Sequence, residues 1–105
     1  MTVNERYQGI IKMRASEQFG NKKAWMRDTE AEILAQITKD EIAQIANFQK
    51  QLADQPTEKL VAMMLGVKEK IAKIEAGEFM DNIEFLRFFR RAIALKQELG
   101  GRNGN

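Results

Sequence analysis

Apolar residues recur every three or four positions along most of this 105-residue chain, and no useful stretch alternates as a strand would. This spacing predicts amphipathic helices. A first helix is expected from about Asn4 to Phe19, ended by Gly20-Asn21, which tolerate the left-handed conformation of a helix C-cap. A second helical stretch is expected over about Lys22 to Ile37, and Thr29 with Glu32 could form a capping box within it.

The segment Ile37-Thr38-Lys39-Asp40-Glu41-Ile42 has the residues of a helix start. Thr38 would be the N-cap, Glu41 follows three residues later, and Ile37 with Ile42 would form a hydrophobic staple. A third helix is therefore expected from Thr38 to about Asp54. Its buried side chains would be Ile42, Ile45, Phe48 and Leu52.

A fourth helix is expected after Pro56, which suits a first helical turn because it lacks an N–H. Its apolar residues follow heptad-like spacing up to Ala76-Gly77. These seam residues are Leu60, Met64, Val67, Ile71 and Ile74. The short connection that follows predicts that this helix and the next form an antiparallel hairpin.

The last helix is expected to begin at Asp81, with Glu84 three residues later and Met80 and Phe85 as a staple. It should end near Leu99. The sequence thus predicts an all-α fold: a compact bundle of four to five helices with a C-terminal antiparallel helical hairpin. Residues 1–99 would form one helical domain and 100–105 a disordered tail.

The last helix carries more apolar surface than one core requires, because its apolar residues span an arc of about 180°. Two alternatives follow: it is the central helix of a monomer, or part of its arc contacts a partner or a second copy of the chain. A second apolar line on the preceding helix also suggests an additional contact. The candidate interface residues are Phe85, Phe88, Phe89, Leu95, Val61 and Leu65.

The net charge of +2 is small, but the charges are unevenly distributed. Residues 1–27 are basic and residues 28–58 are acidic, a pattern that suits complementary surfaces within a folded bundle. Arginines interleave with phenylalanines in residues 85–91, but helical geometry should turn the two residue types apart, which disfavours base stacking. The candidate nucleic-acid contacts, kept as an alternative, are Arg14, Lys22, Lys23, Arg87, Arg90 and Arg91.

A helix-turn-helix fits poorly, because aligning Ala43 with its small residue leaves Pro56 inside the recognition helix. Catalytic chemistry has little support either. The chain has no histidine and no cysteine, so the usual nucleophile–base pairs and bundle metal sites lack residues. We therefore expect no catalytic residues, no metal and no cofactor.

No apolar run is long enough to span a bilayer and the N-terminus has no signal-peptide pattern, so no membrane contact and a cytoplasmic location are expected. The expected function is a non-catalytic protein–protein interaction module, such as an inhibitor, adaptor, assembly factor or other regulatory protein. Its partner would be another protein, itself as a dimer, or both. A phage or mobile-element origin would suit its size. The alternative is a small nucleic-acid-binding accessory protein.

Overall fold

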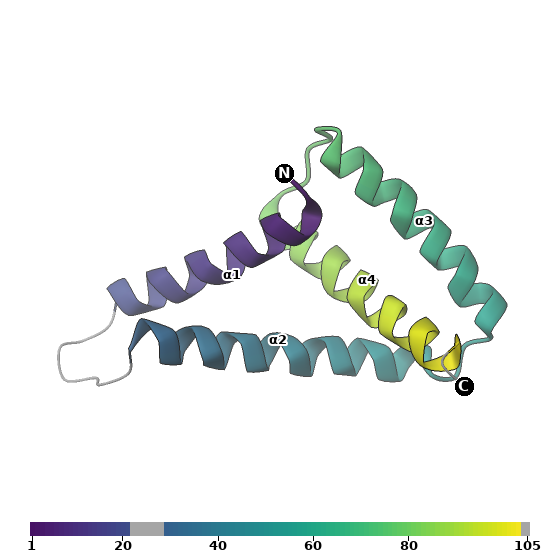
Figure 1. The fold of residues 1–105 in the computed structure, drawn as a ribbon, viewed down its shortest axis with the longest axis horizontal. Helices are drawn as coiled ribbons and strands as arrows, with labels where there is room; N and C mark the ends of the chain where they lie inside the picture. Colours follow the sequence, from purple (N-terminus) through teal and green to yellow (C-terminus); the bar gives the residue numbers. More distant parts are fainter. Residues whose placement is uncertain (22–28, 104–105) are drawn as a thin grey trace.

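All secondary structure in the described part of the chain is helical. The computed structural model describes residues 1–21 and 29–103. It contains α1 (Val3–Gly20), α2 (Glu30–Leu52), α3 (Thr57–Glu75) and α4 (Asn82–Asn103) (Figure 1). The predicted all-α bundle is confirmed, with four helices among the described residues.

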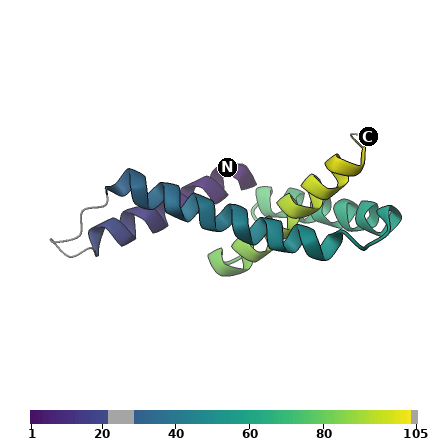
Figure 2. The same cartoon turned by 90° about the horizontal axis from the view of Figure 1, so that it is seen from below.

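The helices form two hairpins, α1–α2 and α3–α4, which pack together mainly through α4. In Figure 1, α1 runs antiparallel to α2, and α3 runs antiparallel to α4, which lies between the other helices. Helix α4 packs against all three others, most extensively against α2, which it crosses obliquely (Figure 2). By contrast, α2 and α3 barely touch. The predicted C-terminal hairpin is therefore confirmed.

Helix α2 is continuous through the predicted start at Thr38, so that prediction is wrong. The true N-cap is Thr29, whose hydroxyl accepts a hydrogen bond from the Glu32 amide at 3.1 Å. The Thr38 hydroxyl instead donates to the Leu34 carbonyl at 2.8 Å, a bond that a residue inside a helix makes. Ile42 lies outside the core and is 62% exposed. The first residues of the predicted second stretch, 22–28, lie outside the described residues.

Continuity of α2 follows from its packing. Four apolar side chains form one stripe along it, facing the other helices: Ile33, Ile37, Ile45 and Phe48. A new helix start at Thr38 would break this stripe, so tertiary burial outweighs the local capping signal.

The start of α4 was predicted correctly, and its end was not. The Asp81 carboxylate accepts a hydrogen bond from the Glu84 amide at 2.9 Å, as an N-cap does. The preceding turn is made by Gly77, whose φ of 110° favours glycine. Helix α4 then continues to Asn103, so residues 100–103 are helical and not part of a tail. Residues 104–105 lie outside the described residues.

The extension of α4 is accompanied by contacts of Arg102. Its guanidinium donates to the carbonyls of Leu52 and Ala53 at 3.2 and 3.1 Å, and to the Thr57 hydroxyl at 2.9 Å. It also pairs with Glu98 one turn earlier. Arg102 thereby joins the end of α4 to the connection between α2 and α3.

The apolar core has two parts. The larger cluster joins α1, α2 and the first half of α4, with Ile74 from the end of α3. The smaller cluster joins the start of α3 to the last turns of α4 through Leu60, Leu95 and Leu99. On α3, Met63 is 42% exposed, although the nearby Met64 and Val67 pack against the smaller cluster. The molecule is thin, with extents of 53 × 33 × 19 Å, and its shortest dimension corresponds to about two helix diameters.

Candidate functional site

A buried carboxylate lies at the junction of three helices. Glu41 of α2 is 3% exposed although it is charged. It accepts hydrogen bonds from the Tyr7 hydroxyl at 2.7 Å and from Arg90 Nε and Nη2 at 2.8 and 2.5 Å. Arg14 Nη1 adds a contact at 3.2 Å. Both carboxylate oxygens are therefore satisfied, and α1, α2 and α4 are joined at one point.

The surroundings shift the pKa values of the cluster in opposite directions. Burial alone would raise the pKa of Glu41, but the hydrogen bonds from Arg90 and Tyr7 and the two arginine charges lower it on balance. Burial and the hydrogen bond to Glu41 raise the pKa of Tyr7. The hydrogen bond to Glu41 also raises the pKa of Arg90. At neutral pH the cluster thus holds a carboxylate, two guanidinium groups and a neutral phenol.

We interpret this cluster as structural. Glu41, Tyr7 and Arg90 bond to one another, and the Arg90 side chain is only 13% exposed, so of the cluster only Arg14, at 37%, is substantially open to solvent. Sequence analysis missed it by assigning Glu41 to a helix start. A signal was available, because Glu41 lies four residues after Ile37 and four before Ile45, in the middle of the buried stripe.

An open trough, defined here by its lining residues, lies on the other side of α4. Its floor is α4, and its walls are α3 on one side and the end of α2 on the other. Two adjoining hollows of about 540 and 330 Å³ form it, and both are lined by Met63 and Arg91. The remaining lining residues are Gly66, Val67, Glu84, Arg87, Phe88 and Leu95 in the larger hollow, and Phe48, Gln51 and Leu52 in the smaller.

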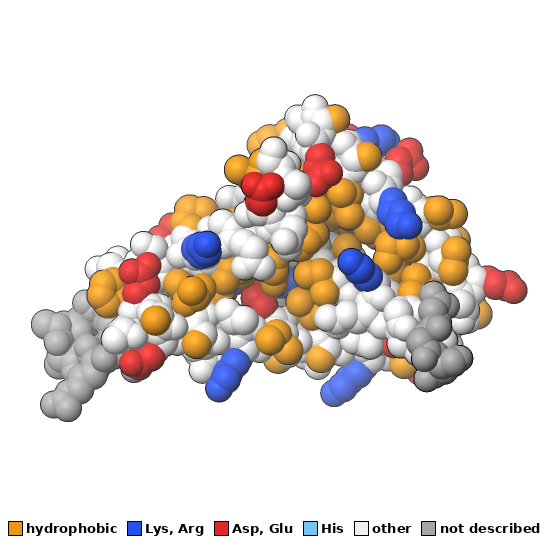
Figure 3. All heavy atoms as spheres, viewed as in Figure 1, with side chains coloured by type: hydrophobic (Ala, Val, Ile, Leu, Met, Phe, Trp, Pro, Cys, Tyr) orange, Lys and Arg blue, Asp and Glu red, His pale blue; other side chains and the backbone are white. Residues whose placement is uncertain are grey.

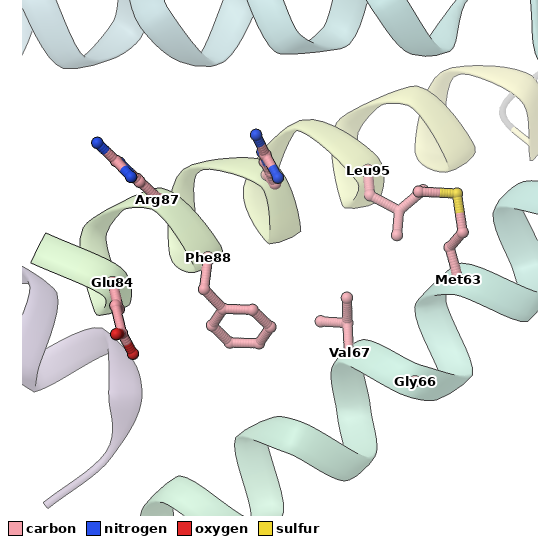
Figure 4. Close-up of a pocket in the computed structure, with 8 residues that line it drawn as sticks. Met63, Gly66, Val67, Glu84, Arg87, Phe88 and Leu95 are labelled. Atoms are coloured by element: carbon pink, nitrogen blue, oxygen red, sulfur yellow. The ribbon is translucent and has the colours of Figure 1, made fainter. Parts of the chain in front are cut away.

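The trough is apolar in its centre and charged along its edge. In Figure 4, Phe88 and Leu95 extend from α4 into the space between it and α3, as Val67 and Met63 do from α3. Arg87 points away from this apolar centre. Apolar side chains also gather over the region between α3 and α4 in the space-filling view of Figure 3. The trough exists because α2 and α3, each packed on α4, do not close over it.

The structure divides the predicted interface residues into three groups. Phe85 and Phe89 are buried inside the chain, and Leu95 is only 2% exposed although it lines the larger hollow, so none of the three forms an exposed surface. Phe88 is half-buried in the trough. Val61 and Leu65 are exposed, but they lie on the side of α3 away from Met63, since residues two positions apart in an α-helix are about 200° apart around its axis. We call Val61 and Leu65 the outer stripe.

The predicted nucleic-acid residues are also dispersed. Arg14 and Arg90 are engaged with Glu41, and the Arg90 side chain is largely buried, so it is not presented to a nucleic acid as predicted. Lys22 and Lys23 lie outside the described residues. Only Arg87 and Arg91 are exposed together, one helical turn apart on α4. The guanidinium of Arg91 lies over the Phe48 ring at 5.3 Å.

The separation of arginines and phenylalanines predicted for residues 85–91 is only partly observed. Phe85 and Phe89 do turn inward, whereas Phe88 lines the same hollow as Arg87 and Arg91. Among the described residues, no group of three or more acidic side chains could hold a metal ion. None of the described helices is both long and apolar enough to cross a bilayer. Comparisons of the chain with protein-family models, curated proteins and solved structures find no match.

Replacing Glu41 should reveal how much the fold depends on the cluster. Glu41→Gln leaves Arg90 buried without its counter-charge, so we expect the free energy of unfolding to fall by about 3 kcal/mol. Urea denaturation at pH 7 measures this change. Glu69→Gln is the matched control: it removes an exposed carboxylate that pairs with Lys73 and should change the value by less than about 0.5 kcal/mol. Equal effects of the two substitutions would contradict the structural role of Glu41.

The stabilisation that Glu41 provides should depend on pH. Because the pKa of Glu41 is lower in the folded chain, its ionisation stabilises the fold above the unfolded-state value of about 4.3. This stabilisation is lost as the pH falls through the folded-state pKa. The stability difference between the natural chain and Glu41→Gln should therefore be largest near neutral pH and shrink below about pH 4.3. Urea titrations from pH 7 to pH 3 test this, and a constant difference would refute it.

Proposed function

We propose that this protein is a non-catalytic protein–protein interaction module and that the trough is its docking surface. The observation that carries this proposal is the set of half-buried or exposed apolar side chains contributed by three helices to one open hollow: Phe48, Leu52, Met63, Val67 and Phe88. Burial of such side chains against a partner removes apolar surface from water and lowers the free energy of the complex. An inhibitor, adaptor or assembly factor needs only a surface of this kind.

The polar chemistry of the described residues supports a binding role over a catalytic one. The buried side chains with shifted pKa values, Glu41 and Tyr7, and their partner Arg90 bond to one another in the cluster. The trough contains two arginines and one glutamate as its charged lining residues, and it supplies no nucleophile–base pair. Its charges suit the orientation of a partner.

Nucleic-acid binding is the second candidate, and one observation favours it. Phe88 lies in the same hollow as Arg87 and Arg91, so a base could stack beside positive charge. An affinity for single-stranded RNA or DNA that falls steeply with salt would support this alternative. The preferred proposal expects no micromolar binding of either nucleic acid at physiological salt.

The docking proposal is tested first by identifying a partner. A photo-crosslinking residue introduced at Gln51, an exposed position of the trough, should capture a partner in the native cell, and mass spectrometry then identifies it.

Two substitutions on α3 should then have different effects on the binding of that partner. Met63→Glu places a charge in the trough and should weaken binding of the purified partner at least about tenfold. Leu65→Glu, on the outer stripe, is the matched control and should leave it unchanged. Loss of binding in Leu65→Glu alone would assign the interface to the outer stripe and refute the trough.

A second prediction concerns self-association. The exposed Val61 and Leu65 could pair with the same stripe of another copy, since a two-fold interface uses one surface twice. Light scattering should then show a dimer that Leu65→Glu converts to a monomer. A single 12.1 kDa species across a wide concentration range would exclude the dimer. Because the outer stripe and the trough lie on different sides of α3, this result is independent of partner docking.

A further inference from the structure

We infer that the trough takes an amphipathic helix of a partner protein, with acidic residues next to its apolar stripe. This inference rests on the proposed docking function and specifies the chemistry of the partner. It follows from the shape of the trough, from the position of its charges, and from the near absence of contact between α2 and α3.

The shape suits a helix. Three helices surround the trough, with α4 as the floor and α2 and α3 as walls that barely touch each other. An added helix would complete a four-helix arrangement, with its apolar residues against Phe88, Val67 and Met63. The lining residues of α4 extend from Glu84 to Leu95, which corresponds to about 16 Å and about three turns of an occupant.

The charges select the partner's composition. Arg87 and Arg91 are exposed, lie one turn apart, and form no ion pair with another described residue. Their spacing along α4 is about 6 Å, which matches carboxylates at positions i and i+4 of an adjacent helix. The only acidic lining residue is Glu84, at one end. An occupant with Asp or Glu beside its apolar stripe is therefore complementary, and a basic one is repelled.

A second copy of this chain fits the trough less well. Each described helix already uses its main apolar face inside the fold. The exposed outer stripe of α3 is flanked by Lys68 on one side and by Glu58 and Glu69 on the other, so its border is of mixed charge and not the acidic border that Arg87 and Arg91 favour. If a second copy nevertheless entered the trough, its own trough would stay open, and association would continue into larger assemblies.

Two synthetic helical peptides test this inference. Both have about 14 residues and the same apolar stripe, but one carries Glu and the other Lys beside it. By fluorescence polarisation at physiological salt, the Glu peptide should bind the natural chain about tenfold more tightly than the Lys peptide. In the double variant Arg87→Glu, Arg91→Glu this preference should reverse, and Met63→Glu should weaken both peptides.

The control is the double variant Lys12→Glu, Lys39→Glu, which changes the net charge equally at exposed positions outside the trough lining. It should keep the preference for the Glu peptide. Circular dichroism should show that both double variants remain folded, because all four side chains are exposed. The inference is overturned if both double variants alter the preference equally, or if Glu-peptide binding survives Met63→Glu.

Failure of the inference and failure of the proposed function are distinguishable. If neither peptide binds while the crosslinked partner remains sensitive to Met63→Glu, the trough is a docking surface for a partner of other chemistry. If self-association is lost in Met63→Glu, the occupant is a second copy and the inference is wrong. If the partner binds equally well to Met63→Glu, the proposed function itself fails.

Discussion

The buried carboxylate of Glu41 is the interaction on which the arrangement of helices depends. An ionised group inside a protein is tolerated only when its charge and its hydrogen bonds are matched. Glu41 meets this requirement with Tyr7 and Arg14 from α1 and Arg90 from α4. Hydrophobic attraction between α4 and α2 is non-directional, so it defines their relative position less sharply than a hydrogen bond does. The fork of Arg90 on the carboxylate fixes one position, because bidentate pairing has a defined geometry.

The fixed position of α4 also determines which of its side chains line the trough. With Arg90 turned toward α2, Phe88 and Arg91 necessarily lie on another side of the helix, where they line the trough. A single rotational position of α4 therefore places Arg90 in the polar cluster and Phe88 in the trough. The fold buries three charged side chains wholly or in part, while it leaves several apolar side chains open to solvent.

Much of the fold could be predicted from the sequence, and the reasons are local. The Asp81 cap, the Gly77 turn and the heptad-like seam of α3 are patterns within a few residues, and each is found in the structure. The prediction failed at Thr38, where a local capping pattern competed with a buried stripe that only tertiary packing uses. The Glu41 pairing joins residues up to 49 positions apart, and the trough depends on how α2 and α3 diverge. Neither feature can therefore be predicted from the spacing of residues that are close in the sequence.

Helix α3 is tied down at both of its ends. Arg102 holds the connection before it, and near its other end the Glu75 carboxylate accepts a hydrogen bond from the Val3 amide at 2.8 Å. Its middle, where Met63 and Val67 line the trough, has no such tie. Because both ends of α3 are held, this wall is in place before an occupant arrives, so binding would cost little free energy for ordering the protein.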